Sequence, residues 1–193
     1  MATMESKVLK FDQGKHEYRI GRRILPSVTG ILKSAGLIDP SFFSAYSAQR
    51  GTYAHLAVHY LNQGALDEDG LDPVIKPYVD GYKKFLSETG FSVEKSEEHL
   101  YSEEIGFAGT TDLIGHFPDG RRAVIDIKTS SYVTWHECQI AAYKLLIGDS
   151  KLLKFGLYLD NTGGYKLRPM VSREAKDVFL AALKIVAFKE AHQ

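Results

Sequence analysis

Cysteines and long apolar runs are what this 193-residue sequence has least of. Its single cysteine, Cys138, excludes an intramolecular disulfide, a four-cysteine zinc site and a four-cysteine iron–sulfur cluster. No apolar run reaches the roughly 18 residues that a membrane span requires. The N-terminal residues MATMESKVLK lack the apolar core of a secretion signal. These absences predict a soluble protein with a cytoplasmic, intracellular location and no membrane partner.

An excess of charge of either sign is also missing. The 24 basic residues balance 24 acidic ones, which excludes the globally basic surface of many nucleic-acid-binding proteins. Local basic groups remain, among them Lys166 with Arg168, so a polyanionic partner is permitted without being required. Hydrophobic residues make up 44% of the chain, and this share predicts one packed domain of ordinary size.

Hydrophobic periodicity predicts an α/β (α+β) fold in which helices flank a central mixed β-sheet. Near the N-terminus we expect a hairpin across 8–20 and a short helix that begins after Ser27 and ends at Gly36. Ser172 is expected to cap the last helix. The other helices are predicted over 41–62, 73–89 and 135–147, and the other strands over 91–104, 106–130, 152–160 and 165–170.

The stretch 106–130 is predicted to form two strands joined by Pro118-Asp119-Gly120. Proline presets φ and glycine accepts the left-handed conformation, which suits a three-residue hairpin loop. This loop pairs Phe117 with Arg121 and brings Asp112 opposite Asp126. A two-residue loop would shift the register by one and send the two acids to opposite faces. We favour the three-residue loop.

Asp126 and Lys128 point to the same face of their strand, because side chains alternate along it. Two carboxylates directly opposite each other repel, so Asp112 and Asp126 need a neutralising partner. A divalent cation with oxygen ligands, with Lys128 beside it, would supply that charge. The alternative is a solvated polar face, because Asp-x-Lys is a common sequence.

The predicted helix 41–62 contains a glycine, Gly51, at a cost of about 1 kcal/mol relative to alanine. Such a glycine indicates either close approach of another backbone or a break between two helices. The space beside it could admit a ligand to His55, one turn further on. His59 lies four residues after His55, but Leu56 stands where a zinc protease has its general base. We therefore expect His59 to be a rim or packing residue.

Four further polar residues are candidates for the same site. Glu97 and Glu98 lie in the predicted strand 91–104, and one of them could reach the acids of 106–130. The alternative for both is a solvated edge. Gln139 and Tyr143 share a face of the helix 135–147, where such residues are usually found at the boundary of the core.

Four short motifs follow one another in the sequence: Gly51-Thr52-x-x-His55, Gly109-x-x-Asp112, Asp126-x-Lys128 and Gln139-x-x-x-Tyr143. In this order the chain resembles the PD-(D/E)xK nuclease superfamily, specifically its RecB-like exonuclease branch. The stretches Pro26-Ser27-Val28-Thr29 and Gly109-Thr110-Thr111-Asp112 are similar to those of the mitochondrial genome maintenance exonucleases and their bacterial and phage relatives. The resemblance covers roughly residues 25–145. It implies a single nuclease domain over 1–193 with a restriction-endonuclease-like core, an N-terminal hairpin and a helical elaboration over about 1–90.

The resemblance also implies roles for individual residues. His55, Asp112, Asp126 and the backbone carbonyl of Ile127 would bind Mg²⁺ or Mn²⁺. Lys128 would orient or activate the attacking water and stabilise the transition state. Catalysis would also use Gln139 and Tyr143, which would shape the site and touch the substrate. The iron–sulfur members of the branch need four cysteines, so no such cluster is expected here.

The function implied is a metal-dependent deoxyribonuclease that acts as an exonuclease on single-stranded DNA ends. The resemblance places it in recombination, repair, replication or phage DNA processing, in a bacterium or phage, with a recombination or replication protein as a further partner. Tyr53, Tyr132 and Trp135 could stack bases, although each is also an ordinary core or rim residue. The alternatives are a catalytically silent nucleic-acid-binding module and a structure-specific endonuclease.

Overall fold

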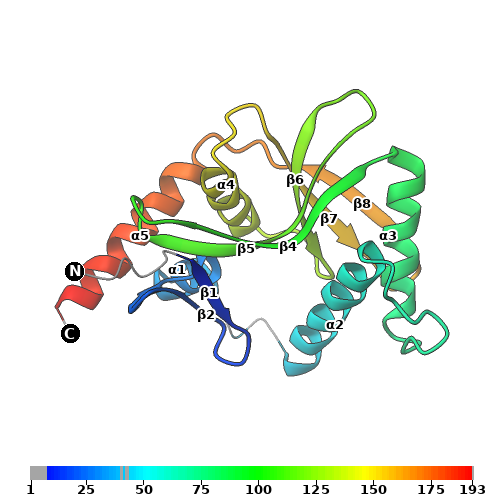
Figure 1. The fold of residues 1–193 in the computed structure, drawn as a ribbon, viewed down its shortest axis with the longest axis horizontal. Coiled ribbons are helices and arrows are strands. Elements are labelled where there is room, and N and C mark those ends of the chain that lie inside the picture. Colours follow the sequence, from blue (N-terminus) through cyan, green and yellow to red (C-terminus); the bar gives the residue numbers. More distant parts are fainter. Residues whose placement is uncertain (1–7, 40, 42–43, 193) are drawn as a thin grey trace, which may run out of the picture.

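The computed structural model describes residues 8–39, 41 and 44–192, and its central feature is a five-stranded mixed sheet (Figure 1). Strands β6 and β7 are parallel, and every other neighbouring pair is antiparallel. Helices cover the sheet, so the predicted α+β class with a central mixed sheet is confirmed. The strand order is β4 (Ser92–Ser102), β5 (Phe107–His116), β6 (Arg122–Lys128), β7 (Leu153–Leu159) and β8 (Tyr165–Pro169).

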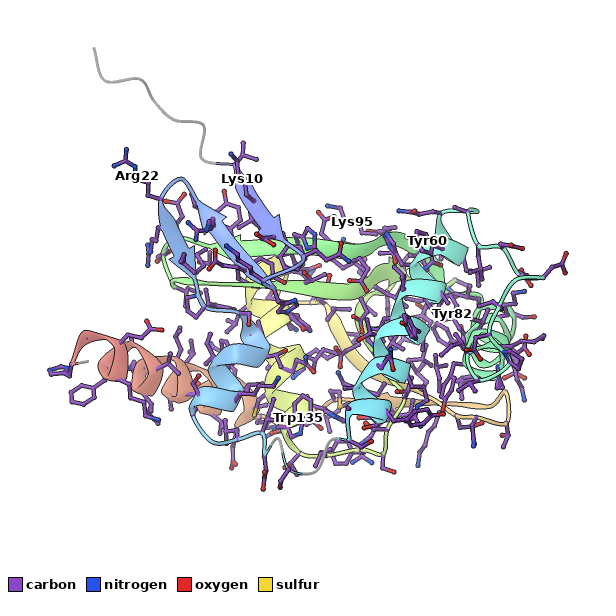
Figure 2. All side chains as sticks on the ribbon, turned by 90° about the horizontal axis from the view of Figure 1, so that it is seen from below. Lys10, Arg22, Tyr60, Tyr82, Lys95 and Trp135 are labelled. Atoms are coloured by element: carbon purple, nitrogen blue, oxygen red, sulfur yellow. The ribbon has the colours of Figure 1, made fainter. Side chains whose placement is uncertain are left out.

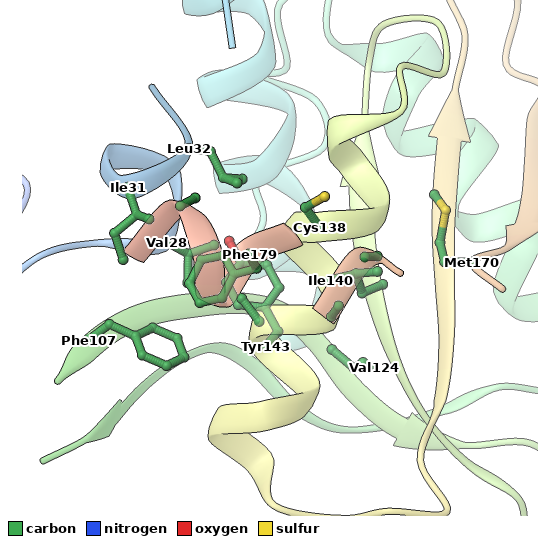
Figure 3. Close-up of a cluster of buried hydrophobic side chains, with 14 of the residues drawn as sticks. Val28, Ile31, Leu32, Phe107, Val124, Cys138, Ile140, Tyr143, Met170 and Phe179 are labelled. Atoms are coloured by element: carbon green, nitrogen blue, oxygen red, sulfur yellow. The ribbon is translucent and has the colours of Figure 1, made fainter. Parts of the chain in front are cut away.

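Two hydrophobic clusters fill the two faces of this sheet. Val124 points into the first, with Phe107, Ile140 and Phe179 (Figure 3). Ala123, Ile125 and Ile127 point into the second, so the alternation predicted along β6 is confirmed. The first cluster lies under α1 (Val28–Ser34), α4 (Trp135–Ile147) and α5 (Ala175–Ala191), and the second under α2 (Ala45–Asn62) and α3 (Lys76–Thr89).

The hairpin between β5 and β6 has the predicted three-residue loop. The Phe117 N–H donates to the Arg121 carbonyl at 3.0 Å, and Gly120 takes a φ of +82°. The ladder pairs Leu113 with Ile125 and Ile114 with Val124. Asp112 and Asp126 are the next residues of this register, so the loop sets the acids level with each other.

The N-terminal hairpin is also confirmed, as β1 (Leu9–Asp12) and β2 (Glu17–Ile20). A third strand that the sequence analysis did not predict, β3 (Arg23–Leu25), pairs with β2 to complete a separate antiparallel sheet. Tyr18 and Leu25 pack this small sheet against Ala108 of β5. The Tyr18 hydroxyl lies 2.6 Å from Thr110 Oγ1, which ties the N-terminal sheet to the strand that carries Asp112.

Two helix starts differ from the predictions. Ser172 does not cap the last helix, whose N-cap is Glu174. The Ser172 N–H donates instead to the buried carboxylate of Glu137, at 3.2 Å. The helix expected from residue 73 begins at Lys76, because residues 72–75 form turns before it. The start expected for α2 falls partly on residues 42–43, outside the described residues. None of the described helices is both long and apolar enough to cross a membrane.

Candidate metal centre

The centre forms where β5 and β6 separate. Their last ladder pair is Leu113 with Ile125, and beyond it the Asp112 carboxylate accepts the N–H of Ile127 at 2.5 Å. A side chain thus replaces the backbone partner that the ladder no longer supplies. Asp112 and Asp126 are 8% and 2% exposed. The separation of the strands therefore holds two buried carboxylates at one level of the sheet.

Helix α2 brings His55 to Asp112. The Nδ1 atom of His55 lies 3.2 Å from Asp112 Oδ1. The helix is continuous through Gly51, and a Cβ at Gly51 would lie 3.5 Å from Thr129 Oγ1. Neither reading of this glycine is realised, because the helix does not break and the nearest atom is a side-chain oxygen at an ordinary contact distance. His59 lies 3.0 Å from Ser96 Oγ on β4, the packing role expected of it.

Glu97 of β4 is the third residue of the candidate ion site, with His55 and Asp112. Its φ is +56°, a conformation that is rare for a residue with a side chain and costs energy within a strand. Ligand atoms of His55, Glu97 and Asp112 all lie within 4.8 Å of one another. Glu98 instead forms an ion pair with Lys95. The open choice between the two glutamates is thus decided for Glu97.

Lys128 lies beside Asp126, with its Nζ 2.6 Å from Asp126 Oδ2. It also donates to Gln139 Oε1 at 2.8 Å. The amide nitrogen of Gln139 in turn donates to the Tyr143 hydroxyl at 3.2 Å and to Thr29 Oγ1 at 3.3 Å. Gln139 and Tyr143 are only 6% and 5% exposed, so they present little surface to a substrate. They position Lys128 from its buried side.

Burial and mutual repulsion weaken the acidity of two of the carboxylates. Burial, together with repulsion from Asp112, raises the pKa of Glu97 to about 7. Burial is also the main reason that the pKa of Asp126 rises to about 6, although Lys128 opposes it. Burial alone would lower the pKa of His55, but the charge and hydrogen bond of Asp112, together with the charge of Glu97, outweigh burial and the pKa rises. The surroundings therefore disfavour the charged forms of Glu97 and Asp126, and a bound cation would offset that effect.

Comparisons with known proteins give limited guidance. No family model matches the chain, and no curated protein matches it. A crystal structure of a "Putative exonuclease" from Eubacterium rectale is 13% identical, with a TM-score of 0.49, over 81% of this chain and 69% of the other. The structure of SSO0001 is 15% identical, with a TM-score of 0.37, over 80% and 82% of the two chains. With TM-scores below 0.5, these likenesses do not decide the function.

The residues present fit a divalent cation. Three carboxylates and one imidazole supply mainly hard oxygen donors, which suit Mg²⁺ and Mn²⁺. Asp126 Oδ2 is buried, and the Lys128 ammonium lies 2.6 Å from it. The possible ion site is formed by His55, Glu97 and Asp112, with Asp126 next to it; the Ile127 carbonyl stays a prediction.

Two residues of the centre were not assigned by the sequence analysis. No sequence signal separated Glu97 from the other glutamates of 94–104. The direction of its side chain depends on a positive φ, which no sequence pattern predicts. Thr29 was quoted only as part of a motif, and its contact with Gln139 spans 110 positions of the chain. The first omission arises from a backbone conformation at one residue, and the second from a contact between segments that are far apart in sequence.

Proposed function

We propose that this chain is a metal-dependent deoxyribonuclease of the PD-(D/E)xK type that hydrolyses phosphodiester bonds. One observation carries the proposal: the Lys128 amine lies 2.6 Å from a buried Asp126, beside the His55, Glu97 and Asp112 cluster. The carboxylates could bind one divalent cation, and the Lys128 ammonium is fixed beside them. Two such positive charges would stabilise the negative charge that develops on phosphate oxygens during hydrolysis.

The side chains divide the work between holding an ion and positioning water. His55, Glu97, Asp112 and Asp126 would hold Mg²⁺ or Mn²⁺, which lowers the pKa of bound water and polarises a phosphate. An ammonium has three N–H donors, and Asp126 and Gln139 engage two of those of Lys128. The third has no acceptor among the described residues and would orient the attacking water or stabilise the pentavalent transition state.

The finer proposal is an exonuclease of the RecB-like branch that acts on single-stranded DNA ends. Its support is the order of the four motifs and the exposed aromatic Tyr53 on α2, which is 50% exposed. A role in recombination, repair, replication or phage DNA processing belongs to the same proposal, as does a partner protein from one of these processes. A catalytically silent module is disfavoured because Asp112, Asp126 and Lys128 are all present and assembled.

The test uses end-labelled single-stranded and double-stranded DNA, linear and circular, with Mg²⁺, Mn²⁺ or a chelator. We expect linear single strands to be degraded when either metal is present and to survive with the chelator. Circular DNA should stay intact. Cleavage of the circles would favour the endonuclease instead. Binding of DNA without cleavage under every condition would favour the silent module.

A further inference from the structure

Two arginines flank the loop of residues 129–134, which leads from Lys128 to α4. Arg50 of α2 donates to the Thr129 carbonyl at 3.1 Å. Arg168 of β8 lies over the Tyr132 ring, with its Cζ 3.7 Å from the ring centroid. Both arginines are half-buried. The segment next to the catalytic lysine therefore has a guanidinium on each flank.

Neither guanidinium is neutralised by the part of the chain that the structure describes. The arginines that form ion pairs there are Arg19, Arg121 and Arg122, each with a carboxylate partner. The Nε atoms of Arg50 and Arg168 are buried and have no hydrogen-bond partner in that same part. A half-buried guanidinium without a carboxylate partner has donors available for an anion from outside. The planar guanidinium fork matches a phosphate group.

Arg168 lies on the face of the sheet that carries the metal centre. Asp126 pairs with Gly156 across the parallel ladder, and Gly156 pairs with Arg168 across the antiparallel one. Paired residues point to the same face, so Arg168 is level with Asp126 and two strands away, about 10 Å by the spacing of strands. Because the Arg168 guanidinium is also held over Tyr132, this spacing suits a phosphate next to the one at the metal centre.

Tyr132 was a candidate for stacking on a base, but the structure gives it another partner. The Arg168 guanidinium covers one face of its ring. Such stacking restricts the arginine side chain, which reduces the entropy lost when the fork binds a ligand. On the same face, Lys166 of β8 pairs with Tyr158, and Tyr158 pairs with Lys128. Positive charge thus continues from the metal centre to the edge of the sheet.

We propose that Arg168, held by Tyr132, binds a phosphate of the nucleic acid strand next to the one that is cleaved, with Arg50 as a second contact on the other flank of the loop. This inference rests on the nuclease function proposed above. It assigns a second phosphate subsite, on β8, and it names a polymeric strand as the substrate, because a small phosphodiester has no phosphate to place there.

Binding is tested in the cleavage-deficient Lys128→Ala background with a labelled single-stranded oligonucleotide. Adding Arg168→Gln should weaken binding by at least about tenfold, which corresponds to about 1.4 kcal/mol. The slope of log affinity against log salt should fall by about 0.7, the contribution of one phosphate contact on a single strand. Arg22→Gln is the matched control, because it removes the same charge on the opposite side of the molecule from Trp135 (Figure 2). Arg168→Lys should recover only part of the loss, because it keeps the charge without the fork.

Catalysis provides a second readout with wild-type Lys128. For Arg168→Gln, the loss in kcat/KM should be at least about tenfold larger on an oligonucleotide than on bis(p-nitrophenyl) phosphate, which has no second phosphate. The oligonucleotide loss should appear mainly as a higher KM. Equal losses on both substrates with an unchanged salt slope would show that Arg168 only supports the fold, and would overturn the subsite.

The two proposals fail in different ways. A wild-type protein that binds no nucleic acid and hydrolyses neither substrate with Mg²⁺ or Mn²⁺ would overturn both. A wild-type protein that cleaves DNA, with an Arg168→Gln variant that binds the oligonucleotide as tightly as Arg22→Gln and with the same salt slope, would overturn the phosphate subsite alone.

Discussion

The two ends of strand β6 carry similar side chains and behave in opposite ways. At its start, Arg122 forms ion pairs with Glu94 of β4 and with Asp149, at 2.9 and 3.4 Å. At its end, Lys128 lies against Asp126. At each end, a basic side chain of β6 thus lies against nearby carboxylates. Strands β4 and β5 contribute further charged side chains to both ends.

Burial accounts for the difference between the two ends. The side chains of Arg122 and Glu94 are 44% and 35% exposed, whereas those of Lys128 and Asp126 are 13% and 2% exposed. Hydrogen bonding from Arg122 lowers the pKa of Glu94, while burial raises that of Asp126 to about 6. Water screens the charges at the first end. At the second end burial removes that screening, so the charges depend more strongly on one another.

The largest effect that would sharpen this comparison is expected for Lys128→Ala. Loss of the ammonium beside the reacting phosphate should reduce DNA cleavage by about 100- to 1,000-fold, while the fold and oligonucleotide binding are mostly retained. Initial rates on end-labelled single strands measure it, with circular dichroism as the check on folding. Arg122→Ala, at the other end of the same strand, is the matched control and should cleave normally. Full activity of Lys128→Ala would remove this residue from the mechanism.

The next effect is on metal binding, through Asp112→Asn. The asparagine oxygen can still accept the Ile127 N–H, so the variant should fold, but it removes a charged ligand. Calorimetric titration with Mn²⁺ should show binding to the wild type and little or none to the variant. The stabilisation by Mn²⁺, about 2.7 kcal/mol at 100 times Kd, should disappear with it. Asp149→Asn is the control; the same Mn²⁺ isotherm for Asp112→Asn and wild type would contradict the ligand role.

The pH dependence of the free energy of unfolding distinguishes the two ends of β6 without any bound ligand. Burial raises the pKa of Glu97 to about 7 and that of Asp126 to about 6, so the folded protein holds protons that the unfolded chain releases. The free energy of unfolding of the metal-free protein should therefore fall as pH rises from about 4.5 to about 7. Glu97→Gln should flatten that decline, as followed by urea denaturation across this range. The lowered pKa of Glu94 acts in the other direction, because its stabilisation is lost as pH falls. A wild-type profile that rises over the same interval would refute the assignment.

The smallest effect is expected for Glu94→Gln. It breaks the exposed contacts with Arg122 and His116, which lie at 2.9 and 3.2 Å. Exposed ion pairs of this kind contribute at most about 1 kcal/mol, so urea unfolding should shift by no more than that. Mn²⁺ binding and cleavage should match the wild type. A large loss of metal affinity would show that the two ends of β6 are coupled, and the contrast between them would fail.

Local sequence predicted much of this site because its key signals are local. Pro118-Asp119-Gly120 specifies a three-residue loop, and that loop alone sets Asp112 level with Asp126. Alternation along β6 then places Lys128 on the same face as Asp126. The spacing of a helix placed His55 one turn after a small glycine, and the structure places its Nδ1 atom 3.2 Å from Asp112 Oδ1.

The sequence by itself determined the central hairpin, its register and the face that carries the acid and the amine, because turn chemistry and side-chain alternation act over a few residues. Only the tertiary structure decided which glutamate joins the centre, what holds Lys128 in place and which arginines lack a carboxylate. Those outcomes depend on a positive φ at Glu97, on Thr29 reaching Gln139, and on Tyr132 lying under Arg168. The first is a backbone conformation that no sequence pattern predicts. The other two are contacts between segments that are far apart in the sequence, so local signals do not predict them.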